Sequence, residues 1–170
     1  QGAEPAPAAK TASWEELTDE VARRLLRGET QTALMALDLA LRSVEWAGQR
    51  EKVEELRRMA RRAVDPLGLA LSELSRRQGR RVRVTVAGQA RELTVQKVEN
   101  RRVTFMEEIR AEGAVVHRPL IVEAGDLAPA GLAGLLEAGE GPEFALARLL
   151  LWHRAGQRER AQALVNETGP

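Results

Sequence analysis

The side chains able to do chemistry in this 170-residue chain are few and scattered. The two histidines, His117 and His153, have no carboxylate or second histidine at the spacing of a metal site. The chain has no cysteine, which excludes thiolate nucleophiles, disulfides and cysteine-held metal clusters. None of the serines lies in the Gly-x-Ser-x-Gly pattern of a nucleophile elbow. We therefore predict structural roles for both histidines, and no metal site.

Carboxylates are plentiful, but their spacing does not favour acid–base catalysis. Adjacent acids on a helix are typical of a solvated surface, where nothing shifts a carboxyl pKa toward neutrality. Glu107 and Glu108 fall in a predicted strand, so their side chains should point to opposite faces. The chain also has no phosphate-binding loop and no dinucleotide fingerprint. These patterns predict a protein that is not an enzyme and that uses no cofactor.

Charge is distributed unevenly along the chain, although the net charge is only +1. Between residues 57 and 83 two acidic residues stand against nine arginines, which are Arg57, Arg58, Arg61, Arg62, Arg76, Arg77, Arg80, Arg81 and Arg83. Between residues 107 and 143 eight acidic residues stand against two arginines. The nine arginines are therefore the candidate interaction surface.

Three interpretations of these charged stretches remain open. A basic surface could follow nucleic-acid phosphates. The near-neutral net charge and a single strand aromatic, Phe105, argue against that reading, because single-strand binders usually offer several stacking aromatics. The two stretches could instead pair between copies, head to tail, and build a ring or filament. They could equally well form salt bridges within one fold.

The first half of the chain has helical periodicity. Ser13 with Glu16 is a capping-box pattern that predicts a helix ending before Gly28. A second helix is expected over about 31–47, and its wide apolar stripe predicts cover on two sides. A third follows over about 50–64. Asp65-Pro66, an N-cap before a proline at the first helical position, predicts a fourth helix to about residue 78.

After Gly79 the apolar period changes from 3.6 to 2, which predicts four antiparallel strands over about 42 residues. Asn100 is expected to adopt a positive φ in one of the turns. Pro119 cannot donate to a ladder, so the fourth strand should be an edge or contain a bulge. Such a meander is too small for a large core of its own, so it should curl into a barrel or lean on helices. A short helix and a helical hairpin are expected after it.

The pentapeptide AGQRE occurs twice, at Ala47–Glu51 and Ala155–Glu159, each time between apolar helical stretches. Gly156 is followed five residues later by the small Ala161, while Gly48 is followed by Val53. This spacing resembles the inner half of a tetratricopeptide repeat, in which a turn glycine and a small residue let two helices pack closely. The resemblance implies the same helical hairpin built twice, with the strands between the two copies, and implies no ligand.

The middle of the chain has a second resemblance. Strands followed by RPLIVEAGDLAPAGLAGLL are similar to SH3-like barrels of the SLA1-homology type, over about residues 80–136. Modules of that type also occur beside helical repeats in bacterial multidomain proteins. The resemblance implies a binding or structural module rather than a catalyst.

Together these patterns predict an α+β fold, with tetratricopeptide-like helical hairpins packed around a small four-stranded antiparallel SH3-like module. The expected divisions are a linker over 1–12, a helical region over 13–78, the SH3-like module over 79–127, and C-terminal helices over 128–166 that pack back on the helical region. The expected function is a non-catalytic protein-interaction or scaffold module that binds a protein partner or a second copy of itself. The alternatives are an extracellular or surface filament subunit and a nucleic-acid-binding module.

The compartment is not determined by the residues. The chain begins at Gln1 rather than at methionine, and its Ala/Pro-rich start is compatible with a secreted, processed chain or with an excised domain. No apolar run reaches the roughly 18–20 residues that a membrane span needs. We therefore expect no membrane span in this chain.

Overall fold

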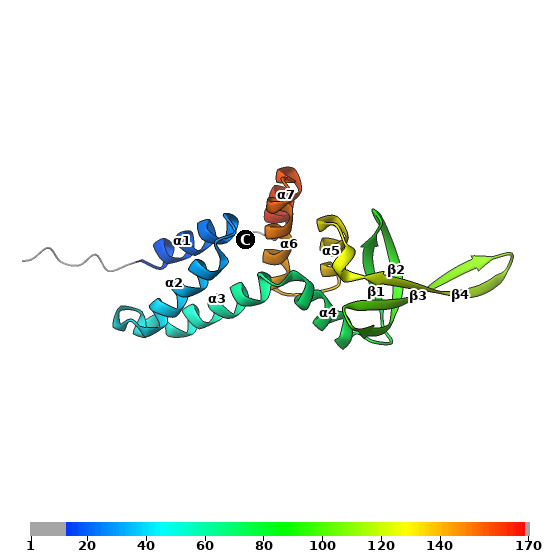
Figure 1. Ribbon diagram of the computed structural model, residues 1–170, viewed down its shortest axis with the longest axis horizontal. Coiled ribbons are helices and arrows are strands. Elements are labelled where there is room, and N and C mark those ends of the chain that lie inside the picture. The colour runs from blue at the N-terminus through cyan, green and yellow to red at the C-terminus, as the bar shows by residue number, and fades with distance from the viewer. Residues whose placement is uncertain (1–12, 169–170) are drawn as a thin grey trace, which may run out of the picture. The chain divides into compact units, whose positions relative to one another are not determined.

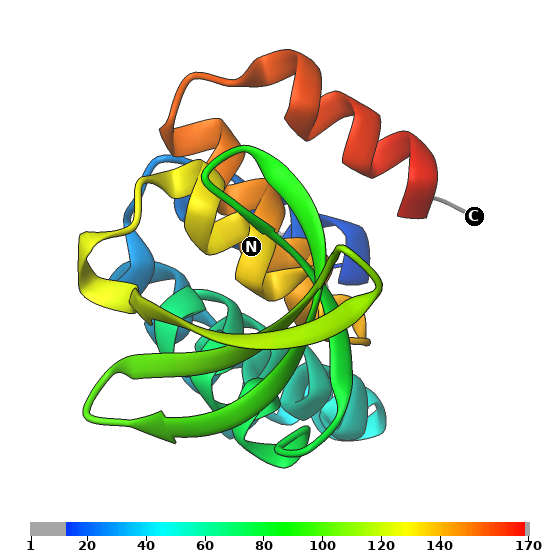
Figure 2. The same cartoon turned by 90° about the vertical axis from the view of Figure 1, so that its right-hand side faces the viewer.

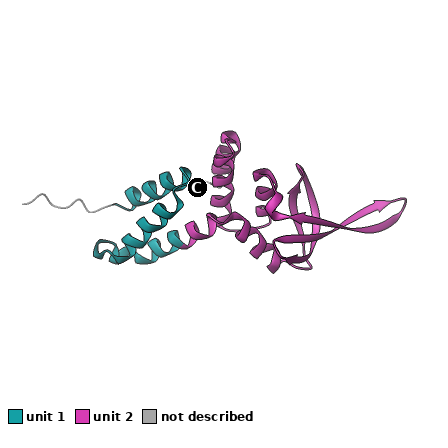
Figure 3. Cartoon of the chain, in the orientation of Figure 1, with its two compact units in different colours: residues 1–57 teal, residues 58–170 magenta. Residues whose placement is uncertain are grey.

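The computed structural model describes residues 13–168, so the predicted linker over 1–12 lies outside the described residues. The protein is α+β, and the described part contains seven α-helices and one four-stranded antiparallel sheet (Figure 1). The chain divides into two compact units, one up to Arg57 and the other from Arg58 onward (Figure 3). This division falls inside helix α3, Arg50–Ala63.

The first unit begins with a helical hairpin. Helix α1, Trp14–Leu26, packs on α2, Thr30–Arg42. The predicted capping box is present, because the Glu16 N–H donates to Ser13 Oγ at 3.1 Å and the Ser13 N–H donates to the Glu16 carboxylate at 3.1 Å. The reciprocal bonds satisfy two donors that the first turn of a helix leaves without partners.

The second helix is shorter than the predicted 31–47. It stops at Arg42, because Ser43 is extended (φ −81°, ψ 138°) and its Oγ accepts a hydrogen bond from the Glu45 N–H at 3.3 Å. Ser43 thereby caps a separate 3-10 helix, η1, Val44–Gln49. Met35 and Leu39 on α2 are 60% and 65% exposed, so the expected cover on two sides of this helix is not found among the described residues.

The second unit begins at the end of α3 and continues into α4, Pro66–Arg76. Asp65 is the N-cap of α4, as predicted, and accepts a hydrogen bond from the Gly68 N–H at 3.0 Å. Helix α4 contacts the sheet through β2 and also contacts the two helices that follow the sheet. It therefore belongs to the core of this unit.

The four strands are β1, Arg81–Val86, β2, Gln89–Glu99, β3, Arg102–Ala111, and β4, Ala114–Glu123. They are joined in sequence order into an open sheet, β1-β2-β3-β4. Each connection has two residues, and both adopt positive φ, as the type I′ hairpin turn requires; they are Ala87 and Gly88, Asn100 and Arg101, and Glu112 and Gly113. The positive φ predicted for Asn100 is thus confirmed, at 51°.

One face of the sheet forms the core with α4 and α5, Pro129–Leu136, and Figure 2 shows these helices behind the curved strands. Helix α5 lies directly on β1. A Cβ atom on Gly134 would stand 2.2 Å from the Thr85 carbonyl oxygen, closer than real side chains come. The glycine therefore allows α5 to touch the strand backbone. The buried apolar side chains of the strands are Val82, Val84, Leu93, Val95, Val103, Phe105 and Val122.

A short 3-10 helix, η2, Ala124–Asp126, leads from the sheet to α5. The chain then forms a helical hairpin from α6, Pro142–Arg154, and α7, Arg158–Thr168. Helices α5 and α6 both contact α4, and α6 contacts α7. Among residues 13–168 no helix is both long enough and apolar enough to cross a bilayer.

Candidate functional site

The nine arginines predicted as an interaction surface lie on several different elements. Four lie on α3, two at the end of α4, one in the loop that follows, and two on β1. Arg57 pairs with Asp38 inside the first unit. The other eight, from Arg58 to Arg83, belong to the second unit. These residues therefore come from both units and from several elements.

Several of these arginines form ion pairs with the acidic stretch over 107–143. The Arg62 Nη1 lies 2.5 Å from a Glu143 carboxylate oxygen, and Arg81 pairs with Glu108. Arg77 lies 2.7 Å from Glu73 on its own helix and 3.7 Å from Glu140. These contacts favour the interpretation in which the two charged stretches form salt bridges within the fold. They also leave fewer cations for phosphate binding.

Arg81 affects the titration of its partner. Its hydrogen bond, and then its positive charge, lower the pKa of the Glu108 carboxyl below the ordinary value. The carboxylate is exposed, so the solvent screens this pair and its contribution to stability is small. Among the residues that the structure describes, the side chains of Arg61, Arg80 and Arg83 have no carboxylate partner.

The two histidines lie apart from each other and are exposed. His117 lies on β4 opposite Glu108, and His153 lies in the last turn of α6. Within the described residues, no group of three histidine, aspartate or glutamate side chains could hold a metal ion. Glu107 pairs with Arg91 and Arg118, while Glu108 pairs with Arg81, as expected if neighbouring carboxylates point to opposite faces.

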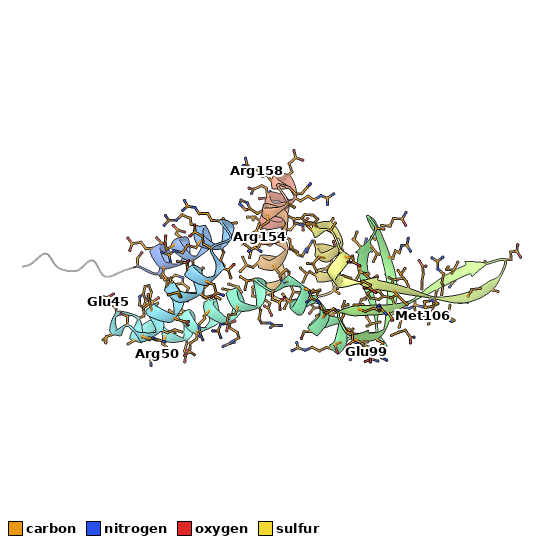
Figure 4. All side chains as sticks on the ribbon, viewed as in Figure 1. Glu45, Arg50, Glu99, Met106, Arg154 and Arg158 are labelled. Atoms are coloured by element: carbon orange, nitrogen blue, oxygen red, sulfur yellow. The ribbon has the colours of Figure 1, made fainter. Side chains whose placement is uncertain are left out.

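The far end of the β3–β4 hairpin forms a two-stranded ribbon. Strand β2 pairs with β3 as far as Met106, whereas β3 and β4 remain paired out to Ala111 and Ala114. Within residues 13–168 the backbone of 107–118 therefore forms strand pairs only with itself, and this ribbon extends past the rest of the sheet (Figure 1). Met106, labelled in Figure 4, marks its base. We call residues 107–118 the projecting ribbon.

Both faces of the projecting ribbon are exposed. Every residue of β4 from Ala114 to Pro119 is exposed, including Val115 at 54% and Val116 at 49%. These two valines point to opposite faces, because they are neighbours on a strand. In the described part of the chain strand β4 pairs only with β3, so the predicted edge position of Pro119 is confirmed.

The second unit also has a cleft of about 400 Å³. It is enclosed by the β1–β2 turn and by helices α5, α6 and α7. Charged and aromatic side chains line it, among them Glu137, Arg148, Trp152, Arg160 and Glu167. The sequence interpretation did not single out these residues. Arg148 and Trp152 are four apart, the spacing of one helix face, but Arg160 and Glu137 join them only through the packing of different helices.

Comparisons with the sequence models of known protein families, with curated proteins and with solved structures find no match for this chain. The projecting ribbon, the charged residues and the cleft are therefore the observations from which a function has to be inferred.

Proposed function

We propose that this chain is a non-catalytic protein-interaction or scaffold module, in which tetratricopeptide-like helical hairpins accompany a small SH3-like sheet. The observation that supports this most is the projecting ribbon. Its two strands pair only with each other among the described residues, so both of its edges carry backbone N–H and C=O groups without a strand partner there. Such an edge is the usual docking site for an extended peptide that adds a strand to a sheet.

The edge of β4 has a defined set of free backbone groups. In a hairpin with a two-residue turn, the two residues that flank the turn form a hydrogen-bonded pair, here Ala111 and Ala114. Non-hydrogen-bonded and hydrogen-bonded pairs then alternate along the two strands. Val115 and His117 fall at the alternate positions, where the N–H points away from β3. Pro119 also falls at one of these outward-facing positions. The N–H that proline lacks is therefore not needed for pairing with β3, which explains how a proline fits into this strand. A partner strand should therefore pair along 114–118, ahead of the proline.

The ribbon also offers side chains for selectivity. Val116 shares a face with Ile109, and Val115 shares the other face with Arg110. A strand bound at this edge would place its side chains alternately on the face of Val115 and on the face of Val116. The backbone hydrogen bonds would then provide affinity, and the two valines would select apolar side chains of the bound strand. Protein binding is favoured over nucleic-acid binding because the ribbon exposes a valine on each face, because its three glutamates outnumber its two arginines, and because several other arginines are already paired.

The tetratricopeptide-like part of the proposal rests on the α6–α7 hairpin. Gly156 adopts φ 72° at its turn, and Ala161 is buried where α7 approaches the neighbouring helix. This is the use of a turn glycine and a small residue that the resemblance implies. The SH3-like part rests on the small curved sheet with its two-residue turns.

The test removes one backbone donor from the edge. His117→Pro deletes the outward N–H at a position of the same parity as Pro119, so pairing with β3 should survive. His117→Val, the matched control, changes the side chain but keeps the N–H. Each tagged variant is incubated with extract of the source cells, bound proteins are quantified by mass spectrometry, and candidates are tested again as purified proteins.

We expect at least one partner that binds the original chain and His117→Val equally, and that binds His117→Pro about tenfold less, as loss of a backbone hydrogen bond together with disturbed strand addition predicts. Circular dichroism checks that the sheet of His117→Pro is intact. The proposal fails if every specifically bound protein is retained equally by both variants.

A further inference from the structure

The cleft between the β1–β2 turn and helices α5–α7 contains a cation whose hydrogen-bonding capacity is not used. The Nε atom of Arg148 is buried and has no acceptor among residues 13–168. Its Nη2 lies 3.9 Å from a Glu137 oxygen, which is an ion pair but too long for a hydrogen bond. A buried donor without an acceptor is costly, and a guanidinium donates hydrogen bonds to a carboxylate with particularly good geometry.

Glu137 is not free to satisfy Arg148 fully. Its Oε2 accepts a hydrogen bond from Thr85 Oγ1 on β1 at 3.1 Å. The carboxylate is thus held toward the strand, which explains the long separation from the Arg148 guanidinium. The Arg148 side chain is 26% exposed, so a second carboxylate supplied from outside can bind the accessible part of its guanidinium without displacing Glu137.

The other cation of the cleft is held in place. The Arg160 guanidinium lies 4.9 Å from the centre of the Trp152 ring, and Trp152 as a residue is 9% exposed. A cation on an aromatic face is attracted by the ring. Trp152 also packs with Ala133 and Ala161, so the wall of the cleft is part of the core of this unit.

The charges of the cleft balance. Arg148 and Arg160 provide two positive charges, and Glu137 and Glu167 provide two negative ones. Glu167 has no cationic partner among the described residues. A simple anion would be attracted by the arginines and repelled by both glutamates, whereas a ligand with both charges can match both. Leu164 and Ala163 add an apolar wall.

We propose that this cleft binds a small zwitterion, of the size of an amino acid or a dipeptide. Its carboxylate binds the Arg148 guanidinium, its ammonium group faces Glu167, and its side chain lies along Trp152 and Leu164. A volume of about 400 Å³ falls in the range of about 300–1,000 Å³ that small-ligand sites occupy. This inference concerns a different part of the unit from the projecting ribbon and does not rest on it.

The test follows the indole N–H signal of Trp152 by NMR during titration of the whole chain. The zwitterionic probes are L-leucine and L-alanyl-L-leucine. Three controls each lack part of the proposed match: N-acetyl-L-leucinamide has no charge, acetate has only a carboxylate, and inorganic phosphate is an anion of higher charge. The indole signals of Trp14 and Trp46, which belong to the first unit, are internal controls.

We expect at least one zwitterion to shift the Trp152 signal saturably. Arg148→Met should weaken that binding tenfold or more, because it removes a charge-assisted hydrogen bond. Glu167→Gln, an exposed substitution in the last turn of α7, should weaken it by a smaller factor. If Arg148→Met does not fold, Ala163→Phe tests the same site by filling it, with Gln162→Phe on the exposed face of α7 as the matched control.

Three results would overturn the proposal. One is that neither zwitterion moves the Trp152 signal at about 10 mM. Another is that the uncharged amide, acetate or phosphate binds as tightly as the zwitterions. The third is that Ala163→Phe and Gln162→Phe bind the zwitterion equally well.

Discussion

Ala47–Glu51 and Ala155–Glu159 have the same five residues, yet the chain reaches the next helix by two different routes. In the second copy α6 continues to Arg154, and Gly156 then adopts φ 72°. The Gly156 N–H donates to the His153 carbonyl at 3.0 Å, and the Gln157 N–H donates to the Trp152 carbonyl at 2.9 Å. This is the Schellman motif, a helix end that depends on a left-handed residue.

In the first copy the preceding helix has already ended before the pentapeptide begins. Helix α2 stops at Arg42, and the Ala-Gly-Gln residues lie inside the 3-10 helix η1. Gly48 does not adopt a positive φ, so its predicted role as the turn glycine that ends the helix is wrong. Only the start of the next helix is shared, at Arg50 and Arg158, both labelled in Figure 4.

The difference is explained by the residues ahead of the pentapeptide. Ser43 stands eight positions before Glu51, and its counterpart eight positions before Glu159 is Leu151. A serine hydroxyl can bond a nearby backbone N–H and so compete with the helix, whereas leucine continues it. The same five residues therefore form a left-handed turn or a 3-10 segment, depending on where the previous helix stops.

The largest effect should come from a β-branched residue at the left-handed position. Gly156→Val is expected to lower the free energy of unfolding by about 2 kcal/mol, because a side chain with φ near 70° collides with its own backbone. Chemical denaturation followed by circular dichroism measures the change. An unchanged midpoint would mean that Gly156 does not need its left-handed conformation, and the contrast between the two copies would disappear.

Introducing a glycine, rather than removing one, tests the same cost of a left-handed side chain elsewhere in the chain. Arg101 adopts φ 63° in the β2–β3 turn, where glycine is preferred. Arg101→Gly should therefore raise the free energy of unfolding by about 1 kcal/mol, since it removes a left-handed side chain. Arg102→Gly is the matched control on the adjoining strand, and it should be destabilising. If both changes destabilise equally, the positive φ of Arg101 is not strained.

The third effect concerns Ser43, the residue to which we attribute the different conformations of the two pentapeptides. Ser43→Ala removes the hydroxyl that accepts from the Glu45 N–H, and it should cost about 1 kcal/mol, as loss of a cap does. Ser43→Leu copies Leu151 of the second region and should extend α2 into residues 44–47. Backbone chemical shifts report that extension. Shifts that stay typical of a 3-10 helix in Ser43→Leu would show that tertiary contacts, not Ser43, end α2.

Much of the local structure could be predicted from neighbouring residues. The capping box of Ser13 and Glu16, the N-cap at Asp65, the turn at Asn100 and the edge position of Pro119 all follow from the backbone chemistry of one or two residues. The early end of α2 was missed because a mid-sequence serine is compatible with either a helix or a cap. The local helical periodicity around Ser43 favoured the helix.

The candidate sites were harder to predict because they depend on packing between distant segments. Arg148 is a candidate ligand-binding residue only because Thr85 holds Glu137 toward the strand. Arg160 is a candidate only because α7 places its guanidinium against Trp152. The ribbon projects because β2 stops pairing with β3 after Met106, and no single residue in the sequence predicts where that pairing ends. The arginine-rich stretch was conspicuous in the sequence, but its members lie on several elements, and several of them have intramolecular partners.

The smallest effect should come from the first copy's own glycine. Gly48 does not adopt a positive φ, and among the described residues, its chain neighbours aside, a Cβ atom added to it meets no atom within 4 Å. Gly48→Ala should therefore raise the free energy of unfolding by about 0.5 kcal/mol, because alanine loses less backbone entropy on folding. The equivalent change in the second copy, Gly156→Ala, should lower it, because φ 72° strains alanine. One substitution made at two identical pentapeptides would then have opposite signs, and equal signs would mean that the two turns share one backbone conformation in solution.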